Sequence, residues 1–164
     1  MNKMSHVTTT PYHDRPYRPC VGIFLLNNET KVFGGRRIDS HAEAWQMPQG
    51  GIDEGEDFFN AALRELEEET SIKNVTLIKE VDGFLTYYLP NHLLGIIWKG
   101  KYKGQKQKWF ITKFNGEETE INIKTKKPEF LEWKWINIEN LSDKVVDFKL
   151  EVYRHIQKEL IKIV

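Results

Sequence analysis

The segment from residue 50 to residue 72, GGIDEGEDFFNAALRELEEETSI, constrains the fold more than any other stretch of this chain. From Asp57 onward its apolar residues recur at helical spacing. They share one side of the predicted helix, and they are Phe59, Ala62, Leu63 and Leu66. An apolar stripe of this kind is typical of an amphipathic helix that packs against a sheet.

Glutamates crowd the second half of the same helix. At about 100° per residue, Glu68 and Glu69 lie within about 60° of Glu65, beside the apolar stripe, whereas Arg64 and Glu67 are expected to point elsewhere. Carboxylates this close together repel each other and have raised pKa values unless a cation neutralises them. A hard divalent ion with oxygen ligands, Mg²⁺ or Mn²⁺, would do so. The alternative is a surface helix with a glutamate-rich face.

The rest of the chain alternates between extended patterns and turns. CVGIFLL (20–26) and KVFGGRR (31–37), on either side of the turn cluster NNET, predict a hairpin. In WQMPQGG (45–51), a proline and two glycines argue against any regular element. Four more segments are rich in β-branched and aromatic residues and are expected to be extended, namely VTLIKEVDGFL (75–85), HLLGIIWKG (92–100), KWFITKF (108–114) and EWKWINI (132–138).

A second amphipathic helix is predicted at the end of the chain, within residues 145–164. Its apolar residues stand at helical spacing, and they are Val145, Phe148, Val152, Ile156, Leu160 and Ile163. Together the patterns predict a mixed sheet between helices, an α/β/α sandwich. The start of the chain, residues 1–19, is polar and contains three prolines, and residues 1–14 are predicted to form a flexible tail. Residues 15–164 are expected to be one domain, since a chain of 164 residues buries a sufficient core without staples.

Charge and cysteine content narrow the function classes. Lys plus Arg and Asp plus Glu both number 24, so the net charge of zero identifies no partner. Cys20 is the only cysteine, which excludes an intrachain disulfide or thiolate cluster and fits a reducing cytoplasm. We expect it to be a small buried residue in a strand, the alternative being a reactive thiol. No signal peptide and no spanning run of roughly 18 apolar residues is found, so we expect a soluble cytoplasmic protein without membrane contact.

The spacing within residues 50–72 resembles the Nudix box, whose pattern is Gly, five residues, Glu, seven residues, Arg-Glu-apolar, any residue, Glu-Glu, any residue, Gly, apolar. The matching residues are Gly50, Glu56, Arg64, Glu65, Leu66, Glu68, Glu69 and Ile72. Ser71 departs from the pattern, which has glycine there. A left-handed residue often ends a helix at such a position. A serine in that conformation costs on the order of 1 kcal/mol but removes no chemistry.

The resemblance implies a hydrolase that cleaves a nucleoside diphosphate linked to another group, with water and a divalent metal ion. By this resemblance the metal ligands are Glu65, Glu68, Glu69 and the carbonyl oxygen of Gly50. The glycine-rich turn before the helix suits this role, because glycine lets the backbone approach a ligand. Glu56 and Arg64 would join the loop to the helix by a salt bridge.

Further resemblance lies outside the box, in YRPCVGI (17–23), WQMPQGG (45–51), GQKQKWF (104–110) and PEFLEWKW (128–135). These stretches are similar to the bacterial RNA pyrophosphohydrolase group, which also resembles the plant-type diadenosine tetraphosphate hydrolases. The similarity implies that Glu129 is a metal ligand or the base for the attacking water. The substrate contacts that it implies are Arg18, Arg37, Tyr87, Lys106, Lys108, Phe148 and Lys149. For Tyr87, stacking on a base and a role in the core both stay open, and the spacing of Phe148 also suits packing.

The resemblance leaves the substrate open between two classes. The preferred hypothesis is removal of pyrophosphate from triphosphorylated RNA, which leaves a 5′ monophosphate and promotes mRNA decay. The alternative is asymmetric cleavage of dinucleoside polyphosphates. Zero net charge weakens long electrostatic contacts with RNA but allows recognition of the first few nucleotides. A binding module that has lost hydrolysis and a hydrolase of damaged nucleoside triphosphates are further alternatives, and the sequence indicates no protein partner.

Overall fold

The computed structural model describes residues 14–38, 44–143 and 149–163. Two long strands, β1 (Tyr17–Leu26) and β7 (Gly104–Phe114), form the centre of the sheet and pair in parallel. Both strands are largely buried on both faces, which is the usual condition of parallel strands that are covered by helices on either side.

Shorter strands complete an eight-stranded sheet. They are β2 (Val32–Arg37), β3 (Trp45–Gln46), β4 (Gln49–Gly51), β5 (Val75–Glu80), β6 (Leu85–Tyr88) and β8 (Phe130–Ile136). The main strand order is β3-β2-β1-β7-β5, with β4 beside β1, β6 beside β7 and β8 beside β2. These strands pair antiparallel, so the sheet is mixed, as predicted.

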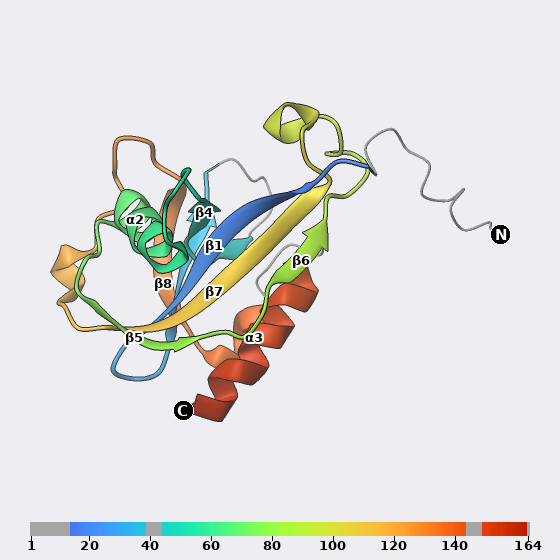
Figure 1. Ribbon diagram of the computed structural model, residues 1–164. Coiled ribbons are helices and arrows are strands. Elements are labelled where there is room, and N and C mark those ends of the chain that lie inside the picture. The colour runs from blue at the N-terminus through green and yellow to red at the C-terminus, as the bar shows by residue number, and fades with distance from the viewer. Residues whose placement is uncertain (1–13, 39–43, 144–148, 164) are drawn as a thin grey trace.

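The helices α2 (Phe58–Thr70) and α3 (Leu150–Ile163) lie on opposite sides of the sheet (Figure 1). The core beneath α2 includes Val21, Ile23, Leu25, Phe110 and, from the helix, Ala61, Ala62 and Leu66. The core beneath α3 includes Phe24, Trp109, Ile111 and, from the helix, Val152, Tyr153, Ile156 and Leu160. Side chains alternate along the central strands between the two cores. The predicted α/β/α sandwich is therefore confirmed. Three short 3₁₀ helices connect its parts, namely η1 (Ile97–Gly100), η2 (Glu118–Glu120) and η3 (Ile138–Asp143).

Both ends of α2 are fixed by local interactions. At the start, the carboxylate of Asp57 accepts a hydrogen bond of 3.1 Å from the backbone N–H of Asn60, which is an N-cap. At the end, Ser71 adopts a left-handed conformation with φ of 69°, and its N–H donates to the carbonyl of Glu67. The helix therefore begins where the sequence predicts, and it ends in the left-handed residue expected at the position that departs from the Nudix pattern.

The expectation that residues 92–100 form a strand is wrong. This segment consists of turns followed by η1, and Trp98 and Lys99 have φ of 52° and 57°. High β-propensity does not produce a strand here, because one side of β7 is occupied by β1 and the other by β5 and β6, so no edge of β7 is open nearby.

Two further segments differ in detail from the prediction. WQMPQGG contains the short strands β3 and β4 on either side of Met47 and Pro48, although the sequence argued against regular structure there. The proline lies between the strands, where the loss of its N–H breaks no ladder. Residues 75–85 are divided into β5 and β6 by a bend in which Gly83 has φ of 71°.

Within the described residues, the C-terminal helix runs from Leu150 to Ile163, inside the predicted segment 145–164. Val145 and Phe148 lie outside the described residues, and so does the predicted N-terminal tail apart from its last residue, Asp14. Cys20 is buried in β1 with 1% exposure, as predicted. In the described part of the chain, no helix is long and apolar enough to cross a membrane.

Candidate active site

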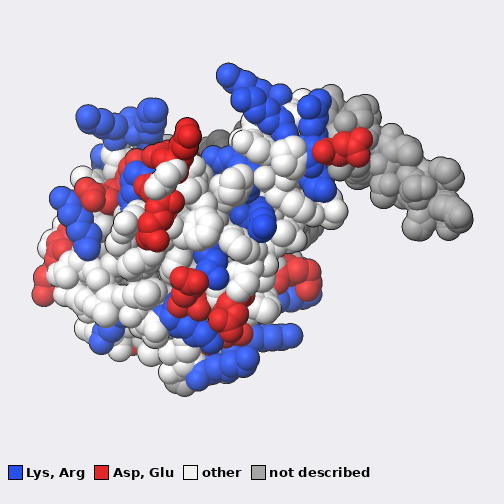
Figure 2. Space-filling model, viewed as in Figure 1, with Lys and Arg blue, Asp and Glu red and all other residues white. Residues whose placement is uncertain are grey.

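A cleft of about 1570 Å³ opens beside α2, near the first residues of the central strands β1 and β7. The predicted site residues that line it are Arg18, Arg37, Gly50, Arg64, Glu65, Glu68, Glu69, Tyr87, Glu129 and Lys149. They come from β1, β2, β4, α2, β6, the loop before β8 and the start of α3, which are far apart in the sequence. Figure 2 shows a group of acidic side chains over α2, with basic side chains nearby on the same face.

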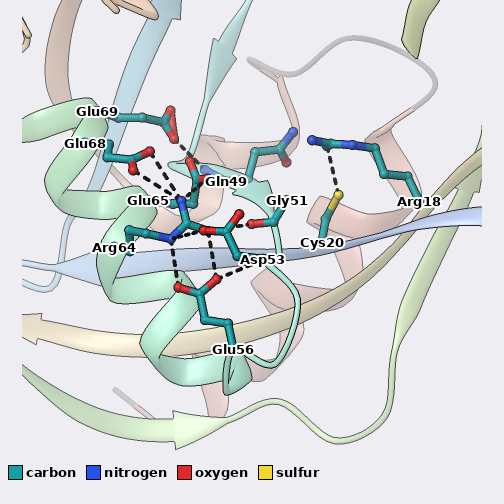
Figure 3. Close-up of polar contacts among 10 residues, drawn as sticks. All are labelled: Arg18, Cys20, Gln49, Gly51, Asp53, Glu56, Arg64, Glu65, Glu68 and Glu69. Carbon is teal, nitrogen blue, oxygen red and sulfur yellow. Dashed lines mark hydrogen bonds and ion pairs between the residues drawn. The ribbon is translucent and has the colours of Figure 1, made fainter. Parts of the chain in front are cut away.

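Glu69 is the most deeply buried carboxylate of the cleft, with 4% exposure. Its Oε1 accepts a hydrogen bond of 3.0 Å from the backbone N–H of Gln49 in β4 (Figure 3). Burial raises the pKa of Glu69 well above its ordinary value, and the negative charges of Glu65 and Glu129 add to this effect. A positive charge entering the cleft would favour the ionised form, so Glu69 is suited to bind a cation.

Glu65 stands one turn before Glu69 and is half-buried. Burial raises its pKa, and the neighbouring guanidinium of Arg64 opposes this shift. The carboxylate lies against Gly50 in β4 so closely that a Cβ at position 50 would collide with it. Glycine is therefore required for α2 and β4 to meet at this point.

Arg64 lies among the carboxylates (Figure 3), which corrects the expectation that it points away from them. Its Nε and Nη2 donate to the two oxygens of Glu56 at 2.8 and 2.9 Å, and its Nη1 lies 2.9 Å from Oε1 of Glu65 and 3.3 Å from Oε1 of Glu68. Nη2 also donates to the carbonyl of Gly51 at 2.9 Å. A helical side chain leans toward the N-terminus of its helix, so a long one reaches the loop that precedes it.

The contact between Glu56 and Arg64 is the salt bridge that the resemblance implies. Hydrogen bonds from Arg64, and then from the backbone N–H of Asp53, lower the pKa of Glu56 to about 2. The bridge ties the loop before α2 to the middle of the helix, and through Arg64 it also reaches Glu65 and Glu68.

The carboxylates of the cleft have the chemistry of ligands for a divalent metal ion, but in this structure they do not stand close enough together to enclose one. Within residues 14–38, 44–143 and 149–163, no three carboxylate, imidazole or thiol groups stand close enough to enclose an ion. Glu65 and Glu68 are both turned toward Arg64. The side chain of Glu68 is 59% exposed, so its rotation costs little. The available donors are oxygens only, and burial raises the pKa values of Glu65 and Glu69, so a bound cation would favour their ionised forms.

Glu129 lies on the loop before β8 and faces the same cleft. Its backbone carbonyl accepts a hydrogen bond of 3.0 Å from the N–H of Ile38, which anchors the loop to the end of β2. Its side chain is exposed, yet its charge reaches Glu69 and raises the pKa of that carboxyl. Folding thus brings Glu129 to the box carboxylates from outside the box.

Basic side chains line the wall of the cleft. Arg18 donates from Nη1 to the Sγ of Cys20 at 3.1 Å, and its guanidinium lies 5.3 Å from the ring centre of Trp98. Arg37 and Lys149 both donate to Oε1 of Gln46, at 3.3 and 2.7 Å. Cations held in this way keep N–H groups at defined positions, which suits the binding of phosphate oxygens.

A model of the NUDIX domain matches residues 16–156. The chain belongs to the Nudix family. It is 63% identical over 145 residues to the RNA pyrophosphohydrolase of Pelagibacter ubique, which covers 88% of this chain and 92% of that protein. It is 48% identical over 150 residues to the RNA pyrophosphohydrolase of Sphingopyxis alaskensis, which covers 90% of this chain and 95% of that protein.

Solved structures share the Nudix fold at lower identity. The E. coli dihydroneopterin triphosphate pyrophosphohydrolase superposes with a TM-score of 0.69 at 21% identity, over 88% of this chain and 99% of that chain. A C. elegans Ap4A hydrolase superposes with a TM-score of 0.60 at 19% identity, over 87% of this chain and 98% of that chain. These likenesses concern the fold.

Two of the lysines that the sequence suggested as substrate contacts lie outside the cleft of this Nudix hydrolase. Lys108 is buried, and its Nζ donates to the carbonyls of Val81 and Gly83 at 2.9 and 3.2 Å. Lys106 is exposed and lies 4.5 Å from the ring centre of Phe84. Both side chains point to the opposite face of β7 from Gln105, which lines the cleft. Phe148 lies outside the described residues.

For Tyr87 the role in the core is confirmed, and stacking on a base stays a prediction. It is 8% exposed and belongs to the core beneath α3, and it also lines the cleft. The Nζ of Lys149 lies 6.0 Å from its ring centre. The ring is therefore a largely buried part of the cleft wall.

The sequence missed several polar residues that line the cleft. They are Gln46, Gln49, His92, Gln105, Thr125, Lys126 and Lys127. Glutamine carries no charge, so these positions give a weaker sequence signal than the neighbouring lysines of β7. The alternation of β7 separates the glutamines from the lysines, but it does not show which of the two faces meets the cleft.

Proposed function

We propose that this Nudix hydrolase removes pyrophosphate from the 5′ end of triphosphorylated RNA and leaves a 5′ monophosphate, in a reaction that requires Mg²⁺ or Mn²⁺. The 63% identity to an RNA pyrophosphohydrolase over 88% of the chain carries the proposal. The cleft supports it, because acidic side chains and the cations Arg18, Arg37 and Lys149 line one space. The reaction would take place in the cytoplasm and would promote decay of the mRNA.

The proposed metal ligands are the carboxylates of Glu65, Glu68, Glu69 and Glu129 and the carbonyl oxygen of Gly50. Such oxygen donors suit Mg²⁺ and Mn²⁺. A divalent ion bound there supplies positive charge to phosphate oxygens and lowers the pKa of a coordinated water. For Glu68 to take part, its side chain must leave Arg64, which keeps its bidentate contact with Glu56.

The remaining cleft residues have roles that follow from their chemistry. Arg18, Arg37 and Lys149 would bind the phosphate oxygens of the 5′ end, because charge-assisted hydrogen bonds to phosphate are strong. The ring of Tyr87 would contact a base, and stacking of this kind contributes roughly 1 to 3 kcal/mol. With zero net charge, binding would depend on the first nucleotides more than on the length of the RNA.

Glu129 is the proposed base. Water adds across the anhydride bond between the α and β phosphates, that P–O bond breaks, and the proton lost by the water goes to the carboxylate of Glu129. The exposed position of Glu129 at the mouth of the cleft suits this role, because the protonated carboxyl can return its proton to solvent.

The deciding experiment incubates the purified protein and Mg²⁺ or Mn²⁺ with two substrates in parallel, a 5′ triphosphorylated RNA oligonucleotide and diadenosine tetraphosphate. We expect the RNA to yield a 5′ monophosphate and pyrophosphate in equal amounts. The same RNA with a 5′ hydroxyl end serves as the control and should not react. If only the dinucleotide is consumed, or if RNA releases orthophosphate instead of pyrophosphate, the proposal is wrong.

A further inference from the structure

A chain of side-chain amides runs from the core to the cleft. Gln105, Gln107 and Trp109 alternate with lysines along β7 and therefore project from one face of the sheet. The indole N–H of Trp109 donates to Oε1 of Gln107 at 2.9 Å. Nε2 of Gln107 donates to Oε1 of Gln105 at 2.6 Å and to Oε1 of Gln49 at 3.3 Å. These residues of β7 are at most 3% exposed.

The direction of every hydrogen bond in this chain follows from its first member. An indole nitrogen donates and never accepts, so Gln107 must turn its oxygen toward Trp109. Its NH₂ group then has two N–H donors for the opposite side, and each meets an oxygen, one from Gln105 and one from Gln49. All hydrogen-bonding positions of the Gln107 amide nitrogen are used, as expected for a buried amide.

The chain ends at two residues that line the cleft. Because Gln105 and Gln49 give their oxygens to Gln107, their NH₂ groups are the ends that remain for the cleft. Gln49 is also fixed through its backbone, whose N–H donates to the carboxylate of Glu69 at 3.0 Å. Gln49 is thus held beside Glu69, the most deeply buried carboxylate of the cleft.

We propose that Gln105 and Gln49 bind phosphate oxygens of the substrate through their NH₂ groups, and that Gln107 and Trp109 are positioning residues that keep these amides from turning over. The inference rests on the proposed function, since it concerns substrate binding in the same cleft. Phosphate oxygens only accept hydrogen bonds, so an amide that presents NH₂ attracts them and one that presents oxygen repels them. The indole of Trp109 therefore determines whether amide NH₂ groups or amide oxygens face the cleft.

The first test changes the polarity of the chain at Gln107. Gln107→Glu keeps an acceptor for Trp109 but removes both donors, so the amides of Gln105 and Gln49 should reverse and present oxygen to the cleft. Gln107→Met removes donors and acceptor without adding charge. We expect KM for triphosphorylated RNA to rise about tenfold in Gln107→Glu and less in Gln107→Met, with kcat within about twofold of wild type. Lys113→Gln, an exposed change on the same strand, should leave both constants unchanged.

A double-mutant cycle distinguishes a positioning role of Gln107 from a general structural role. Gln105→Leu should raise KM by itself, and Gln107→Met should add little in the Gln105→Leu background, because the donor that it orients has already gone. Melting temperatures identify any variant that fails to fold. Additive effects on KM, or an unchanged KM in Gln105→Leu, would overturn the proposal.

A spectroscopic test needs no turnover and no variant. Nuclear magnetic resonance follows the side-chain NH₂ signals of Gln49 and Gln105 during titration with an α,β-methylene nucleoside triphosphate, which is not cleaved at that bond. Both signals should shift, whereas the Gln107 signal should exchange slowly with D₂O. Signals of Gln49 and Gln105 that stay in place would contradict the inference. A protein that shows these shifts but does not hydrolyse RNA would refute the proposed function alone.

Discussion

Arg64 determines how the charges of the cleft are balanced at the scale of single residues. One guanidinium contacts Glu56, Glu65 and Glu68, and it also holds the carbonyl of Gly51. Without this cation the carboxylates would repel each other across a partly buried space. Because each carboxylate has a different degree of exposure, their substitution should have different consequences.

Replacement of Glu68 should lower turnover with little effect on the stability of the fold. Its side chain is 59% exposed, so Glu68→Gln should leave the melting temperature near that of wild type. Turnover should fall on the order of 10²-fold or more, because a proposed metal ligand is lost. Glu67→Gln, one residue away on the same helix, is the matched control and should retain activity. Wild-type turnover in Glu68→Gln would count against the metal site.

Glu56 should make the stability of the protein depend on pH in the acidic range. Hydrogen bonds from Arg64 and Asp53 lower its pKa in the fold from 4.5 to about 2. The unfolded chain therefore binds the proton more tightly, so Glu56 stabilises the fold fully above about pH 4.5 and loses this contribution as the pH falls toward 2.

The measurement compares melting temperatures of wild type and Glu56→Gln over this range. The variant should be less stable at pH 6, and the difference should shrink as the pH falls from 4.5 toward 2. Glu54→Gln removes the same charge from the same loop and controls for net charge. A difference that is independent of pH would show that the Glu56 carboxylate is not held as described.

At the scale of elements, the two ends of α2 are set by local interactions, and its second half holds the proposed metal ligands. The N-cap at Asp57 and the left-handed exit at Ser71 fix its length, so Glu65 and Glu69 arrive one turn apart beside β4. The hydroxyl of Ser71 donates to the carbonyl of Asn122 at 2.9 Å, which ties the exit to the chain before β8.

The left-handed exit gives a prediction about helix stability. Ser71 has φ of 69°, a region that glycine adopts without the Cβ penalty. Ser71→Gly and Ser71→Ala both lose the hydroxyl, so their comparison isolates the backbone effect. We expect the glycine variant to be more stable than the alanine variant by about 1 kcal/mol in denaturant unfolding. Equal stability would mean that residue 71 is not left-handed in solution.

At the scale of the whole molecule, the site exists only in the folded chain. Carboxylates from α2, the carbonyl region of β4 and Glu129 before β8 converge on one cleft, and cations from β1, β2 and the start of α3 face them. A ligand that binds only this assembled site must stabilise the fold by mass action.

Metal should therefore raise the melting temperature. At a concentration of 100 times Kd, a divalent ion would contribute about 2.7 kcal/mol, which for a chain of this size corresponds to about 5 to 10 °C. Millimolar Mg²⁺ or Mn²⁺ should produce the shift in wild type, and EDTA should reverse it. The double substitution of Glu68 and Glu69 by glutamine should remove it. A wild-type melting temperature indifferent to both ions would contradict the account.

Local patterns by themselves determined α2 and its glutamate stripe. Residues three and four apart on a helix are neighbours whatever surrounds them, so the relation of Glu65 to Glu68 and Glu69 is present in the spacing. The left-handed exit at Ser71 was expected from the resemblance to the Nudix pattern, which has glycine at that position. Residues that alternate on a strand could be assigned to two faces, but the sequence could not decide which face meets the cleft.

The contacts of those residues depend on how the whole chain folds. The tertiary structure turned Lys108 toward the carbonyls of Val81 and Gly83 and gave the cleft to Gln105 instead. It brought Arg64 back over the loop before α2, and it left residues 92–100 without a strand because β7 had no open edge. Each outcome depends on contacts between segments far apart in the chain, and no local spacing contains that information.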